Sequence, residues 1–88
     1  MPTLVMLNRW KIQLYPQERE AAHLHVESAG EVFRFDLANL EQLATDIRRA
    51  PVSMARTIRV WGEMNRTALE AVYTDLLAGR RPDKSLFR

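Results

Sequence analysis

The chain has 88 residues, enough for one domain, with 13 Lys and Arg, 11 Asp and Glu, and no cysteine. The absence of cysteine excludes disulfides and thiolate metal sites, and a net charge of +2 is too small to indicate a dedicated nucleic-acid binder. No apolar run approaches the roughly 20 residues of a membrane span, and no basic segment precedes the first apolar run, so we expect a cytoplasmic protein without a signal peptide or a membrane contact.

The first part of the chain has the pattern of β-strands. Residues 3–7 form a short apolar run, and Asn8-Arg9 is suited to a turn. Apolar and polar side chains then alternate over residues 10–15, which is typical of a half-buried strand. Residues 16–22 are mostly polar and predict a connection to the next strand.

A second hairpin is predicted over residues 23–36, around Ala29-Gly30. If these two residues form the whole loop, the apolar side chains of both strands meet on one face without adjustment. A three-residue loop with Gly30 in a bulge is the alternative, and it would shift the pairs by one. With the two-residue loop, the expected pairs on the apolar face are Val26 with Phe33 and Leu24 with Phe35.

The second part of the chain has the spacing of helices. Apolar residues recur every three or four positions over residues 37–50, which predicts a first helix that ends before Pro51. Ser53 can cap a second, longer helix over residues 53–78, which Gly79 would end. We therefore expect an α+β fold, in which a small antiparallel sheet of two hairpins is followed by two helices.

The second predicted helix is long for so small a protein. At 1.5 Å per residue it would span ~39 Å, whereas a domain of this size measures roughly 25–30 Å. Either part of the helix projects and packs on another chain, or Gly62 breaks it. We expect one domain over residues 1–79 and a flexible charged tail over residues 80–88. The expected contact surface for a partner or a second copy consists of Trp61, Met64, Val72 and Leu76.

The two histidines of the chain, His23 and His25, are two positions apart on a predicted strand, so both side chains lie on the same face. A metal site is one interpretation, but Glu27 lies about 13 Å along the strand from His23. The chain offers no other His or Cys, and we expect neither a metal nor a cofactor.

Two further interpretations of the pair stay open. In the first, His25 and His23 act as general acid and base in a small RNA-cleaving site. Arg34 on the opposite strand would hold the phosphate, and Tyr15 would assist. In the second, the imidazoles are half-exposed strand residues that pack with their neighbours or cover the sheet against a partner.

The arginines of the second helix alternate with glutamates. Arg59–Glu63 and Arg66–Glu70 have i,i+4 spacing, and Glu63–Arg66 has i,i+3 spacing, which predicts a neutralised, solvated face. The arginines without such obvious partners are the better candidates for an anionic contact; they are Arg48, Arg49 and Arg56.

The chain as a whole resembles a known family. It opens with Met-Pro-Thr before an apolar strand, carries the motif His23-Leu24-His25-Val26, and follows it with a glycine turn and Phe-Arg-Phe-Asp. Residues 65–71 are similar to the closing helix of the same family. These features resemble the small prokaryotic proteins catalogued as domain of unknown function 4160. The resemblance implies a cytoplasmic protein that is often one half of a gene pair of the toxin–antitoxin type.

From these features we expect a small non-enzymatic interaction protein, one component of a toxin–antitoxin-like or regulatory complex. The partner would be a second protein or a second copy of the chain, and contact with nucleic acid has weak support from the charge. The alternative is a metal-independent ribonuclease-like toxin that uses His23, His25 and Arg34.

Overall fold

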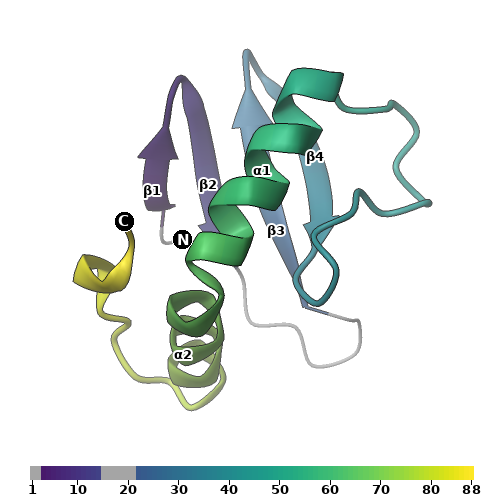
Figure 1. The fold of residues 1–88 in the computed structure, drawn as a ribbon. Coiled ribbons are helices and arrows are strands. Elements are labelled where there is room, and N and C mark those ends of the chain that lie inside the picture. The colour runs from purple at the N-terminus through teal and green to yellow at the C-terminus, as the bar shows by residue number, and fades with distance from the viewer. Residues whose placement is uncertain (1–2, 15–21) are drawn as a thin grey trace.

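The structure is a computed structural model that describes residues 3–14 and 22–88. Four strands form one antiparallel sheet in the order β1-β2-β3-β4, and two helices follow the sheet in the chain (Figure 1). The predicted α+β class is therefore confirmed. The elements are β1 (Thr3–Leu7), β2 (Trp10–Leu14), β3 (His23–Ser28), β4 (Glu31–Asp36), α1 (Val52–Met64), α2 (Arg66–Leu77) and a short 3-10 helix, η1 (Lys84–Leu86).

The β3–β4 hairpin has the predicted two-residue loop. Val26 pairs with Phe33 and Leu24 with Phe35, so the alternative register with a bulge is excluded. Both loop residues adopt positive φ, as the turn of a two-residue hairpin requires. The polar connection expected at residues 16–22 lies, except for Ala22, outside the described residues, and so does Tyr15.

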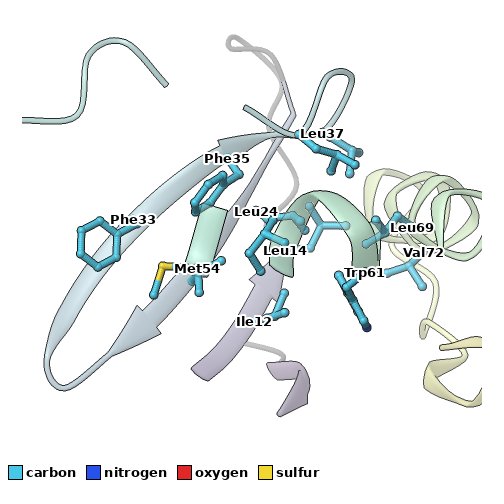
Figure 2. Packing of buried hydrophobic residues seen from close by; sticks show 13 residues of the cluster. Ile12, Leu14, Leu24, Phe33, Phe35, Leu37, Met54, Trp61, Leu69 and Val72 are labelled. Atoms are coloured by element: carbon cyan, nitrogen blue, oxygen red, sulfur yellow. The ribbon is translucent and has the colours of Figure 1, made fainter. Parts of the chain in front are cut away.

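The core lies between one face of the sheet and the two helices. α1 crosses this face diagonally, and α2 lies next to the C-terminal end of α1 (Figure 1). Figure 2 shows how the side chains of the strands meet those of the helices. Each fully buried aliphatic or aromatic side chain contributes roughly 1.5–3 kcal/mol. The sheet supplies Ile12, Leu14, Leu24, Val26, Phe33 and Phe35, and the helices supply Met54, Ile58, Trp61, Leu69 and Val72.

The prediction of a helix over residues 37–50 is wrong, because this segment is an irregular connection between β4 and α1. Asp36 and Asn39 accept hydrogen bonds from backbone N–H groups two positions on, at 2.7 and 2.9 Å, and so compete with helical hydrogen bonding. Leu40 has a φ of 61°, which no helix residue adopts. Leu43 then donates its N–H to the carbonyl of Arg34 at 2.9 Å, which ties the segment to the edge of β4.

The continuous helix predicted over residues 53–78 is broken, and the break lies at Asn65 rather than at Gly62. Asn65 has a φ of −113° and is 2% exposed, and its side-chain Nδ2 donates to the carbonyl of Trp61 at 2.9 Å. Beyond this break, α2 places Leu69 and Val72 in the core. The protein measures 32 × 29 × 23 Å, and the longest helix within residues 3–14 and 22–88, α1, has 13 residues.

Residues 80–88, expected as a charged tail, lie against the helices through Phe87. Its ring stacks on Trp61 with the ring centroids 5.6 Å apart. The N–H of Arg88 donates to Oδ1 of Asn65 at 2.8 Å. Asn65 thus joins α1, α2 and the chain terminus. No helix within residues 3–14 and 22–88 combines the length and the apolar character that crossing a membrane requires.

Candidate functional site

Both histidines lie on the outer face of the sheet, opposite the core, as their spacing predicts. The centroids of the two imidazole rings are 4.8 Å apart. His25 is half-buried, and His23 is only 2% exposed. The expectation of two half-exposed rings is therefore wrong for His23. Because β3 is an inner strand, side chains from β2 and β4 stand on both sides of it.

Arg34 stands opposite His25 on β4, as the hairpin register predicts, but its charged end is committed to another residue. Its Nε donates to Oδ1 of Asp46 at 2.7 Å, and its backbone N–H donates to Oδ2 of Asp46 at 2.8 Å. Gln42 Nε2 donates to the same Oδ2 at 3.0 Å. Asp46 therefore holds the irregular segment onto the outer face of β4.

The environment of Asp46 favours its charged form. Burial, which leaves the side chain 9% exposed, raises the pKa of this carboxyl. The hydrogen bonds from Gln42 and Arg34 outweigh burial and leave the pKa below its ordinary value. Sequence reasoning missed Asp46, because residues 37–50 had the spacing of a helix and nothing local pointed to Arg34.

The imidazole of His25 is biased toward its neutral form. Burial is the largest cause that lowers its pKa, followed by the nearby His23 and Arg34, while Asp46 acts in the opposite direction. At neutral pH the ring is therefore able to accept a proton. Arg34, the cation that the sequence matched with His25, is paired with Asp46.

The lowered pKa of His25 predicts a specific dependence of stability on pH. The unfolded chain takes up a proton near pH 6.5, whereas the folded state resists protonation until a lower pH. We expect the urea midpoint of the wild type to fall as the pH drops below about 6.5, and to stop falling from this cause once the folded state is protonated too.

The His25→Gln variant should lack this part of the pH dependence. The comparison needs urea unfolding of both proteins at pH 8 and at several values down to pH 4. A constant difference between the two midpoints across this range would contradict the pKa direction.

Two of the three arginines proposed for an anionic contact are bound to other groups of the same chain. Arg48 pairs with Glu31 at 2.5 Å, and Arg49 Nη2 donates to the carbonyls of Leu43 and Asp46 at 2.9 and 2.7 Å. Arg56 is exposed and makes no hydrogen bond or ion pair with a described residue.

Of the three ion pairs predicted along the helices, only Glu63–Arg66 is formed among the described residues. Glu63–Arg66 forms at 2.5 Å, and Arg66 also donates to the carbonyl of Leu37 at 3.2 Å. Arg59 lies 3.9 Å from Glu41 on the irregular segment. Among the described residues, the predicted pairs Arg59–Glu63 and Arg66–Glu70 are not formed.

The residues predicted to contact a partner do not share one exposed surface. Trp61 and Val72 belong to the core, and Leu76 is half-buried against it, whereas Met64 is 67% exposed. The amphipathic pattern of one continuous helix had placed them together. In the structure, Trp61 is buried with Met54 and Ile58 of α1, and Val72 is buried with Leu69 of α2 beyond the break at Asn65. The exposed apolar side chains of α1 are instead Val52, Val60 and Met64.

The outer face of the sheet offers no evident metal centre. Within the part of the chain that the structure describes, no three His, Asp or Glu side chains lie close enough together to hold a metal ion. Scans of the chain against protein-family models, curated proteins and solved structures gave no match.

Proposed function

We propose that the protein is a non-enzymatic interaction module, one small component of a regulatory complex of the toxin–antitoxin type. The observation that carries this proposal is the row of exposed apolar side chains on α1. Val60 and Met64 line a groove of about 320 Å³ together with Trp61, and Val52 lies two turns before Val60 on the same helix. Single exposed apolar residues are ordinary, but several on one helix favour contact with another protein.

The surroundings of His23, His25 and Arg34, which together we call the histidine cluster, support binding rather than catalysis. Cleavage of a phosphodiester needs a cation that can meet the charge developing in the transition state. Arg34 is held by Asp46 instead, and His23 has almost no contact with solvent. Arg34 and Asp46 instead hold the irregular segment against β4.

Membership of the family catalogued as domain of unknown function 4160 is part of the same proposal. Its support is the motif His23-Leu24-His25-Val26, which lies on β3 with the apolar members toward the core. The family's gene pairing supplies the expected kind of partner, a second small protein encoded beside this one.

Co-expression with the product of the adjacent reading frame tests the proposed function. We expect the two proteins to co-elute in size-exclusion chromatography with a light-scattering mass above that of one chain. The double variant Val60→Glu, Met64→Glu should lose the complex, whereas the control Ala71→Glu, an exposed change on α2, should retain it. A wild-type protein with the mass of one chain, unaffected by its neighbour, would contradict the proposal.

Expression alone separates this function from the ribonuclease alternative. We expect cells that produce the wild type and cells that produce His25→Ala to grow equally well. Growth arrest by the wild type, relieved by His25→Ala, would instead assign catalysis to the cluster.

A further inference from the structure

The free edge of β4 has hydrogen-bonding groups that face away from the sheet. The outward backbone N–H groups of Arg34 and Asp36 are hydrogen-bonded to the irregular segment. The N–H of Arg34 donates to the carboxylate of Asp46, and the N–H of Asp36 donates to the carbonyl of Glu41 at 2.8 Å. Backbone groups of a strand alternate in direction with a period of two residues. The N–H and C=O of Val32 therefore point outward along the same edge.

The space beside Val32 is open and has the form of a slot. The irregular segment between β4 and α1 arches away from β4 before it reaches α1 (Figure 1). A groove of about 550 Å³ lies between residues 31–34 and residues 45–48. Within the described residues, no backbone group pairs with the outward groups of Val32, whose side chain is 51% exposed, and Ile47 is fully exposed at the rim.

We propose that this slot binds one extended peptide segment of a protein partner, which adds to the sheet as a fifth strand beside β4. The inference rests on the proposed function and specifies which kind of segment the partner protein inserts. An extended backbone is the ligand that satisfies an outward N–H and C=O on a strand edge. The carboxylate of Asp46 already occupies the neighbouring position at Arg34, so the added strand begins where this contact ends.

The charges around the slot indicate which side chains the segment carries. Arg34 is paired with Asp46, and Arg48 is paired with Glu31, so the lining charges neutralise each other in pairs. The exposed apolar side chains of the lining are those of Val32 and Ile47, and Thr45 adds one hydroxyl. The segment is therefore uncharged and mainly apolar. A second copy fits less well, because its own β4 would bring another arch, residues 45–48, into the same space.

The test uses a random heptapeptide library displayed on phage, selected against the purified full chain, and synthetic copies of the enriched peptides. Val32→Pro removes the outward N–H at a position where an edge strand tolerates proline. Val32→Thr keeps the N–H and is the matched control. We expect affinity to fall about tenfold in Val32→Pro, the equivalent of one hydrogen bond, and to change little in Val32→Thr.

A second measurement does not depend on the folding of the proline variant. Peptides N-methylated at one residue at a time are titrated into the wild-type protein, and amide shifts are followed by NMR. We expect one methylated position to lose about tenfold in affinity, and the shifted amides to include Val32 and residues 45–48.

Three results would contradict the proposed slot. The first is equal peptide affinity for Val32→Pro and Val32→Thr, and the second is that the peptides shift only amides of α1. The third is a selection that enriches no peptide. A complex with the neighbouring protein whose affinity is the same in Val32→Pro and Val32→Thr would contradict the slot and leave the proposed function intact, whereas no complex with the wild type would remove the function itself.

Discussion

Replacing Asp46 with alanine is expected to lower the free energy of unfolding by about 2–3 kcal/mol. The side chain accepts three hydrogen bonds, two of them from Arg34 and one from Gln42, and it is nearly buried. Hydrogen bonds to a charged group contribute about 1.5–3 kcal/mol each but do not add independently. The irregular segment would lose its main attachment to β4. Urea unfolding at pH 7 measures the effect.

Asp75→Ala is the matched control for this prediction. Asp75 also accepts from an arginine Nε, that of Arg80, at 2.9 Å, but this pair lies on the surface. Exposed pairs contribute about 0–1 kcal/mol, so the control should be nearly neutral. Equal losses in the two variants would show that burial of the Asp46 network contributes nothing.

The Asp46 contribution should also depend on pH. Its pKa lies below the ordinary 3.8 in the folded state, so the stabilisation is present above that value. It is lost as the pH falls through the lower folded-state pKa. The difference in stability between the wild type and Asp46→Ala should therefore be constant from pH 7 to about pH 5 and shrink below about pH 4. A difference that persists unchanged at pH 2 would contradict the charged, hydrogen-bonded state of this carboxyl.

Gly62→Val is expected to lower the free energy of unfolding by about 3 kcal/mol. A Cβ at this position would lie 2.7 Å from both terminal methyl carbons of Leu40, which is itself buried. Overfilling a packed site costs about 1–3 kcal/mol, and valine adds two further methyl groups. The helix itself would gain little, because valine is a moderate helix former. Ser53→Val, at an exposed position of the same helix, controls for propensity and should change stability by less than about 1 kcal/mol.

A double-mutant cycle that combines Gly62→Val with Leu40→Ala isolates the contact. Leu40→Ala alone should cost about 2–4 kcal/mol through the cavity that it leaves. In the double variant, the methyl groups of the introduced valine fill this cavity. The combined loss should therefore be smaller than the sum of the single losses by more than about 1 kcal/mol. Additive losses would show that Leu40 does not pack against Gly62.

The sheet could be predicted from sequence because a strand's pattern is local. Leu24 and Val26 alternate with the histidines, and Phe33 alternates with Arg34, so parity alone separates the buried face from the outer face. The register followed only if Ala29-Gly30 formed the whole loop, and it is the structure that excludes the three-residue alternative.

The irregular segment shows where such patterns fail. Leu37 and Leu40 have helical spacing and are buried, as helix residues would be, but a loop buries them. Periodicity reports which side chains are removed from water and does not report the backbone path that removes them. The short polar side chains of Asp36 and Asn39 were the local signal for turns.

The amino-acid sequence by itself determined the class of the fold, the apolar face of the second hairpin and the shared face of His23 and His25, because these follow from the period of neighbouring residues. Only the tertiary structure decided that Arg34 is neutralised by Asp46, that Asn65 divides the helix, and that Trp61 and Val72 face the core. Each of these depends on contacts between segments distant in the chain, such as Arg34 with Asp46 across 12 positions and Asn65 with Arg88 across 23. Local spacing carries no information about such contacts, since their energy appears only when the helices and the irregular segment close over the sheet.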